Sequence, residues 1–322
     1  MSGKSRTLYL GGLVCSLLVF SAVQSAFGQP RVGRGLQFTD PKRYYEELLE
    51  KDSRNAGAHY HLGLEHLREP QNTEKAVEHL ERAVELDGEN AEYHYRLGEA
   101  YIADFTYASI FRKPFIAAKV KAQLEQAVQY DPGSIQYREA LIEYYVCAPS
   151  ILGGSFSKAS QQAEFIAAVD PYLGTLARAR ISAEEGEPKN AVMLYKKAIR
   201  MHPQGWQAYQ RFGIYYLNRR QVDEAIAMFK KYVEVAPINA DSYLNLGRAY
   251  ERKRMYDEAI ASFQMAFERD QSLTHLVFRI AQLYEFKGSK REAVLFYQKY
   301  LGLVSAGRAA DDARTKIRDL SL

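Results

Sequence analysis

The sequence has few of the residues that mark several common classes of protein. Its 322 residues include two Cys, one Trp, 10 Pro and 21 Gly. Two Cys cannot build a disulfide-based scaffold, and 47% apolar residues with little Gly and Pro exclude a disordered polymer. Charge of one sign is also scarce, because 43 Lys and Arg are interspersed with 39 Asp and Glu. We therefore expect a packed protein without the clustered positive charge that nucleic-acid binding requires.

Apolar residues form one long run, close to the start of the chain. Lys4 and Arg6 precede an apolar stretch over residues 7–23, and small residues follow up to Gly28. This order is typical of a secretory signal peptide over residues 1–28, cleaved after Gly28. An uncleaved membrane anchor is the alternative, although the run is short for a ~20-residue span. Cleavage would leave a mature chain without a transmembrane segment, located in a bacterial periplasm or secreted.

A repeat of 34 residues dominates the rest of the sequence. Small and aromatic residues recur at this spacing in four sets: Gly213, Gly247 and Ala281; Tyr216, Tyr250 and Tyr284; Ala225, Ala259 and Ala293; Phe229, Phe263 and Tyr297. Such a period predicts helical hairpins in which the small residues lie where the two helices cross and the aromatics fill holes left by the next hairpin. One hairpin cannot bury its own apolar face, so we expect the hairpins to stack.

These residues resemble the tetratricopeptide repeat (TPR) in both spacing and residue type. The resemblance implies an all-α fold, a right-handed superhelical solenoid of stacked helical hairpins. We expect an N-terminal segment with a capping helix in residues 29–55 and a C-terminal capping helix in residues 306–322. Between them, residues 56–305 are expected to form seven TPR-like hairpins, over residues 56–90, 91–133, 134–171, 172–205, 206–239, 240–273 and 274–305.

Two neighbouring hairpins have additional residues between their helices. The sequences are "DFTYASIFRKPF" at 104–115 and "CAPSILGGSFSKA" at 147–159, with Ser155 or Ser157 placed to cap the helix that follows. Intra-hairpin turns stack along one edge of a solenoid, so the two insertions are expected to be neighbours. One interpretation is two long turns, since loops tolerate insertions. The other is a recognition surface, the insertion edge, formed by Tyr107, Phe111, Arg112, Phe115, Gly153, Gly154 and Ser155.

The same insertions suggest a second kind of ligand. Gly153, Gly154 and Ser155 open a predicted helix, whose N–H groups can bind an anion with help from Arg112 or Lys113. No strand precedes them and no P-loop Lys follows, so the signal is weak. The pairing of "FRKPF" with "APSILGGS" also resembles exported bacterial repeat proteins, which implies no activity.

The TPR resemblance places the first helices of the hairpins along a concave groove. The matching groove positions carry aromatic, aliphatic and basic side chains: Tyr60, Leu64, Tyr95, Leu244, Arg248, Arg252, Phe278 and Phe286. Apolar anchors of this kind suit an extended peptide or a partner helix. The two Arg favour an acidic ligand.

Other candidate sites are weaker. Five His lie in one region, at positions 59, 61, 66, 79 and 94, but three of them occupy repeat positions where a large aromatic packs, so packing is favoured over metal binding. Cys147 lacks a His nearby in the sequence and is interpreted as a small core residue. The sequence contains no catalytic motif, so we expect no enzyme, no metal and no cofactor.

The sequence thus predicts an exported TPR scaffold or adaptor that binds a protein or peptide through its concave groove and its insertion edge. The alternative is a periplasmic carrier of a small anionic or amphipathic ligand.

Overall fold

The computed structural model describes residues 40–68 and 72–321. The predicted signal peptide, residues 1–28, lies outside these described residues. Within them the chain forms α-helices and one short 3-10 helix and no strand, which confirms the all-helical prediction. No helix in these ranges combines the length and apolar character needed to cross a bilayer. The chain divides into two compact units between Ala191 and Val192.

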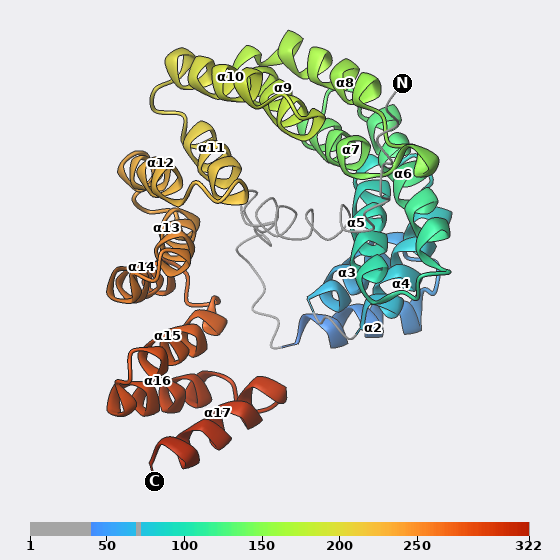
Figure 1. Ribbon diagram of the computed structural model, residues 1–322. Helices are drawn as coiled ribbons and strands as arrows, with labels where there is room; N and C mark the ends of the chain where they lie inside the picture. The colour runs from blue at the N-terminus through green and yellow to red at the C-terminus, as the bar shows by residue number, and fades with distance from the viewer. Residues whose placement is uncertain (1–39, 69–71, 322) are drawn as a thin grey trace. The chain divides into compact units, whose positions relative to one another are not determined.

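The first unit consists of helices that pair with their neighbours along the chain (Figure 1). They are α2 (Pro41–Lys51), α3 (Ala56–Leu67), α4 (Thr73–Leu86), α5 (Ala91–Tyr107), α6 (Lys113–Tyr130), α7 (Ile135–Cys147), the 3-10 helix η3 (Ser150–Leu152), α8 (Phe156–Val169) and α9 (Pro171–Glu185). The unit boundary falls within α10 (Pro188–Met201). The pairs α3–α4, α5–α6 and α7–α8 lie within the first three expected hairpins.

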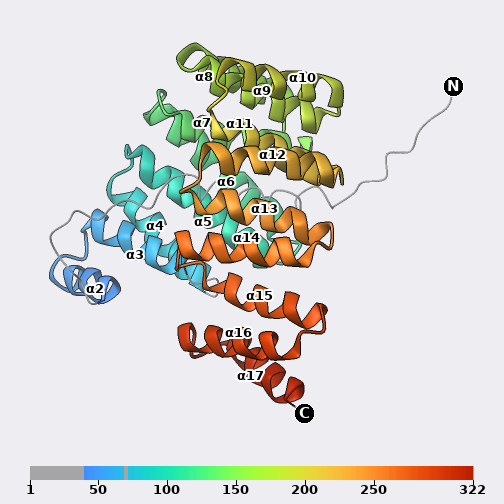
Figure 2. The ribbon, with the colours of Figure 1, turned by 90° about the vertical axis from the view of Figure 1, so that its left-hand side faces the viewer.

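The second unit continues the pattern. Its further helices are α11 (Trp206–Asn218), α12 (Val222–Val235), α13 (Ala240–Arg252), α14 (Tyr256–Arg269), α15 (Thr274–Phe286), α16 (Lys290–Leu303) and α17 (Arg308–Leu320). The pairs α11–α12, α13–α14 and α15–α16 are stacked in chain order, and α17 packs against α16 (Figure 2). A separate single helix, α2, packs on α3 at the start of the first unit.

The small residues of the repeat lie where two helices cross. A Cβ atom on Gly213 would be 2.4 Å from Cε1 of Phe229, and one on Gly247 would be 2.6 Å from Cδ1 of Phe263. Both phenylalanines are fully buried. The close crossing that the repeat predicts is therefore confirmed, with the aromatic ring of the second helix lying directly on the glycine of the first.

Tyrosine joins successive hairpins in the first unit. The hydroxyl of Tyr101 in α5 donates to Glu81 in α4. Twenty residues separate these partners, and the same separation recurs in the next pair, where Tyr145 in α7 donates to Glu125 in α6 over 2.8 Å. The tyrosine ring packs in the core between two hairpins, and its hydroxyl forms a hydrogen bond at the edge of that core. This role accounts for part of the unusual number of Tyr, 24 in the chain.

The two insertions are built differently. Helices α5 and α6 have 17 and 18 residues, whereas α3, α11 and α13 have 12 or 13. Most of the first insertion therefore extends two helices, and a short turn at 108–112 remains.

The second insertion is a turn around η3. Gly153 has φ +92°, and a Cβ atom on Gly154 would be 1.7 Å from the carbonyl oxygen of Ala148. Ser155 accepts a hydrogen bond from the N–H of Lys158 and so caps α8, one of the two capping residues expected from the sequence. Gly153 also lies against the side chain of Lys121, which places this turn on the body of α6.

The histidines near α3 and α4 pack against aromatic rings and each other. Nδ1 of His59 and Nδ1 of His79 are 3.0 Å apart, and the ring of His66 stacks on His79. His61 stacks on Tyr45. Among the described residues, no group of three or more His, Cys, Asp or Glu is arranged to hold a metal ion.

Candidate functional site

An exposed apolar cluster lies at the end of the α5–α6 hairpin. Tyr107 is 66% exposed, Ile110 60%, Phe111 84% and Phe115 74%. Three of these residues belong to the predicted insertion edge, and Ile110 was missed, although it precedes Phe111 in the same short turn. A contiguous group of exposed apolar side chains often marks an interaction site, whereas single exposed apolar side chains are common on protein surfaces.

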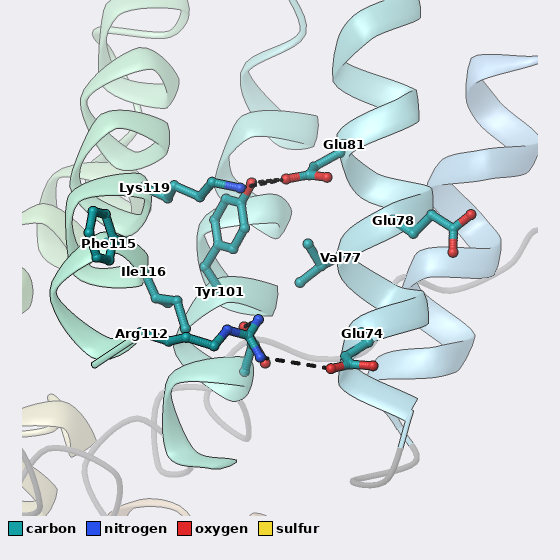
Figure 3. A pocket seen from close by; sticks show the side chains of 10 residues that line it. Glu74, Val77, Glu78, Glu81, Tyr101, Arg112, Phe115, Ile116 and Lys119 are labelled. Carbon is teal, nitrogen blue, oxygen red and sulfur yellow. Dashed lines mark hydrogen bonds and ion pairs between the residues drawn. The ribbon is translucent and has the colours of Figure 1, made fainter. Parts of the chain in front are cut away.

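A hollow of about 520 Å³ lies beside this cluster, between α4, α5 and α6 (Figure 3). Two residues of the insertion edge, Arg112 and Phe115, line it. The other lining residues were not singled out from the sequence: Glu74, Val77, Glu78, Glu81, Tyr101, Asp104, Ile116 and Lys119. Its volume is in the range of sites that accept a ligand or several side chains.

The helices give the hollow an apolar floor. Tyr101 and Ile116 are buried, and Val77 packs against the same core. On α4 the lining residues Glu74, Val77, Glu78 and Glu81 follow the spacing of one helix face, i, i+3, i+4 and i+7. The extension of α5 places Asp104 one turn beyond Tyr101, on the same face.

Three ion pairs cross the hollow: Lys119 of α6 pairs with α4, and Arg112, in the turn just before α6, pairs with α5 and with α4. Nζ of Lys119 is 3.0 Å from Oε1 of Glu81, and Arg112 lies 3.5 Å from Asp104 and 3.9 Å from Glu74. Figure 3 shows Arg112 and Lys119 reaching toward Glu74 and Glu81, with Tyr101 between them. Because Arg112 is more than half exposed, its pairs contribute little to stability and can exchange for a partner's charge.

The protonation states of Glu81 and Tyr101 are set by burial and by their hydrogen bonds. Burial alone would raise the pKa of Glu81, but the hydrogen bonds from Tyr101 and Lys119 lower that pKa below its ordinary value. Burial and the bond to Glu81 raise the pKa of Tyr101. At neutral pH, Glu81 is therefore a carboxylate and Tyr101 a hydrogen-bond donor.

The hollow carries an excess of negative charge. Its lining has four carboxylates and two cationic side chains. Asp104 and Glu81 are matched by Arg112 and Lys119, whereas Glu78 has no ion pair within the described residues. Glu74 is held loosely, at 3.9 Å. This charge favours a cationic group over the anionic ligand considered from the sequence.

The turn around η3, called the glycine turn because it contains Gly153 and Gly154, contributes no residue to the lining of the hollow. The sequence had predicted one recognition surface built from both insertions. The N–H of Gly153 donates to Ser150, that of Gly154 to Pro149 and that of Ser155 to Tyr145, all to backbone carbonyls within 3.1 Å. These three groups are used inside the turn and are not available to an anion. An anion at this turn would therefore have to use N–H groups other than those of Gly153, Gly154 and Ser155.

Two of the three predicted groove residues of the first unit contact other side chains of that unit. Tyr95 is 1% exposed and packs on Tyr137, so its assignment as a groove contact is corrected. Tyr60 is half-buried and donates to Glu92, which also accepts from Tyr137. Leu64 is half-buried. Glu92, which the sequence did not mark, connects this surface.

The groove residues of the second unit fall into three groups. Leu244 is 7% exposed and lies in the core, which corrects its assignment, because the face it occupies is packed against neighbouring helices. Arg248 is half-buried, and this burial lowers its pKa. Arg252 and Phe286 are exposed, while Phe278 packs edge-on against Tyr297 and Tyr300.

Family models match both units of the chain. Models described as tetratricopeptide repeat match residues 194–227, 211–272 and 274–303, and a model described as TPR repeat matches residues 65–104. A search of curated protein sequences found no match.

The fold is similar to those of several solved structures. For yeast Tom70 the TM-score is 0.60 with 14% sequence identity, over 87% of this chain and 57% of that chain. The Cut9–Hcn1 hetero-tetramer of APC/C gives a TM-score of 0.43 with 16% identity, over 87% of this chain and 52% of that chain. The human IFIT1 dimer with PPP-AAAA gives 0.45 with 20% identity, over 86% and 67%. The chain spans little more than half of the Tom70 chain, and this similarity concerns the fold alone.

Proposed function

Because the chain is a tetratricopeptide repeat protein, we propose that it is an exported, non-enzymatic scaffold that binds another protein through the end of its α5–α6 hairpin. TPR proteins bind protein partners, and this chain adds a surface of its own to the repeat. One observation carries the proposal. Four large apolar side chains stand exposed next to a 520 Å³ hollow with an apolar floor, and burying such side chains drives association.

A photo-crosslinking experiment tests this surface. A photoreactive phenylalanine analogue replaces Phe111, and in separate variants Phe286 or Phe165, in the full chain expressed in its own cells. Phe286 reports on the groove, and Phe165 is a matched control, an exposed aromatic on α8 that does not line the hollow. We expect a discrete crosslinked product from position 111 and none from position 165. Equal products at 111 and 165 would remove the support for a specific site, and a product from 286 alone would move the function to the groove.

The export component needs its own test, because the residues that carry it lie outside the described ranges. Residues 1–28 combine a basic start, an apolar stretch and small residues before Gln29. We expect residues 1–35 fused to a reporter phosphatase, active only outside the cytoplasm, to give activity in a bacterial host. Replacing Leu17 and Leu18 by Asp in the apolar stretch should abolish that activity. An inactive native fusion that is nevertheless synthesised would refute export and leave the binding surface untouched.

A further inference from the structure

The lining of the hollow has two more carboxylates than cationic side chains. The positions of the less well paired carboxylates indicate where a cationic group of a ligand would bind. Glu81 pairs with Lys119 of α6, and Asp104 pairs with Arg112 of the turn before it. Glu78 has no ion pair among the described residues, and Glu74, which is 83% exposed, lies 3.9 Å from Arg112. Both of these glutamates lie on α4, on the side opposite the exposed ring of Phe115. A ligand that covers Phe115 and enters the hollow therefore meets Glu78, which has no ion pair among the described residues, and Glu74, whose pair with Arg112 is loose.

The apolar part of the hollow sets a second requirement. Its floor of Val77, Tyr101 and Ile116 is bordered by Phe115, and Phe111 lies four residues earlier in the chain, in the turn at 108–112. One large apolar side chain on this floor would bury area at about 25 cal/mol per Å². The volume of about 520 Å³ leaves room for a second side chain. The methylene stem of a Lys or Arg can lie on apolar surface while its charged end reaches a carboxylate.

We propose that the hollow binds a segment of the partner protein that presents a large apolar side chain next to a Lys or Arg. The apolar side chain lies on the floor against Phe115, and the cationic group lies between Glu74 and Glu78 on α4. This inference rests on the proposed function and specifies the chemistry of its partner. It places the contact on the second helices of two hairpins, α4 and α6, and on the end of the first helix α5, and none of the predicted groove residues lines it.

A lipid bilayer is the competing occupant for exposed aromatic side chains flanked by Arg112 and Lys113. The charge of the lining argues against it, because four carboxylates outnumber two cationic side chains there and an anionic membrane surface would be repelled. The shape of the hollow also disfavours a bilayer. A projecting side chain of a protein can fill the concave hollow, whereas a flat membrane surface would leave the hollow empty. A cationic peptide segment fits both properties.

The probe is a library of random twelve-residue peptides displayed on phage and selected on the full mature chain. Selected peptides are synthesised with a fluorophore, and their affinity is measured by anisotropy. The test variant is Glu74→Gln with Glu78→Gln, which keeps shape and removes charge. The matched control is Glu85→Gln, on the same helix but outside the lining and paired with Arg82. Vesicles with about 30% anionic lipid are run in parallel, by sedimentation.

We expect the selected peptides to share a Lys or Arg within a few residues of a large apolar residue. Their affinity should fall roughly 3- to 10-fold on the double variant, fall with added salt, and stay unchanged on Glu85→Gln. Phe115→Ser should weaken them as well. Peptides without a shared basic residue, no selectable peptide, equal affinity for the double variant, or vesicle binding that depends on Phe111 would each overturn the proposal. A crosslinked protein at position 111 together with any of these results would leave the proposed function standing and reject only this chemistry.

Discussion

The crossing of α13 and α14 at Gly247 offers a quantitative test of the repeat mechanics. Replacing Gly247 by Ala adds one methyl group, whose carbon would be 2.6 Å from Cδ1 and Cε1 of the buried Phe263 ring. A carbon–carbon contact needs about 3.5 Å or more, so the helices or the ring must move by roughly 1 Å. The ring is 1% exposed, so a movement of this size also displaces the side chains that cover it.

Two effects of opposite sign determine the magnitude. Ala is favoured over Gly within a helix by up to about 1 kcal/mol, and overpacking a core costs about 1–3 kcal/mol. Gly247→Ala should therefore destabilise the second unit by roughly 0–3 kcal/mol. Gly302→Ala in α16 isolates the first effect, since no atom lies within 4 Å of its added carbon. We expect this control to be neutral or more stable by up to about 1 kcal/mol.

Thermal unfolding followed by circular dichroism measures the difference between the two variants, about 1–3 kcal/mol or several degrees in Tm. A Phe263→Leu background supplies a second check. The smaller side chain opens space at the crossing, so Gly247→Ala should cost less there than in the native chain, with a coupling of about 1 kcal/mol. The reasoning fails if Gly247→Ala and Gly302→Ala shift Tm equally, because the crossing would then tolerate a methyl group.

Three further predictions concern the first unit. Gly154→Ala should lower Tm by several degrees, because the added carbon would lie 1.7 Å from the carbonyl oxygen of Ala148, whereas Gly133→Ala, whose nearest contact is 3.5 Å, should change Tm little; equal shifts would contradict this account of the turn. Tyr145→Phe should cost about 1 kcal/mol in chemical denaturation, because Glu125 loses its 2.8 Å hydrogen bond, and an unchanged midpoint would show that the tyrosine bonds between hairpins add no stability. Burial, and then the charges of His59 and His66 with Lys42, lower the pKa of His79 below 6.5, and the opposing effect of Glu78 is smaller. The folded chain then binds fewer protons than the unfolded chain at mildly acid pH, so stability should be full above about pH 6.5 and decline as pH falls below it. His79→Gln should reduce the Tm difference between pH 7.5 and 5.5, and an undiminished difference would assign the effect elsewhere.

The hairpin architecture could be predicted because its determinants recur along the sequence. Gly213 and Gly247 are followed sixteen residues later by Phe229 and Phe263, and the structure shows these pairs in contact. A helix crossing that needs a small residue against a large one leaves a periodic signal, which one sequence suffices to detect. Burial along the first helices was harder to predict. Tyr95 and Leu244 were assigned to an open groove from their repeat positions, but Tyr95 is covered by Tyr137 and Leu244 by the core of its unit.

The hollow could not be predicted from the sequence, for a different reason. On α4, Glu74, Glu78 and Glu81 form a polar stripe that is indistinguishable, in sequence, from an ordinary solvated helix face. These glutamates line a hollow only because the next hairpin carries an insertion, which was interpreted from the sequence as a loop. Because the added residues extend α5 and α6, Asp104 joins the face of Tyr101, and Arg112 reaches back to Glu74. The tyrosine–glutamate spacing offered one usable signal, since Tyr101–Glu81 and Tyr145–Glu125 share a separation of 20 residues. At the second of these positions the glycine turn lies on Lys121, the residue that pairs with Glu125. The two insertions therefore act in opposite ways on equivalent positions. One extends a hairpin so that a hollow forms beside it, and the other folds its turn onto the neighbouring helix.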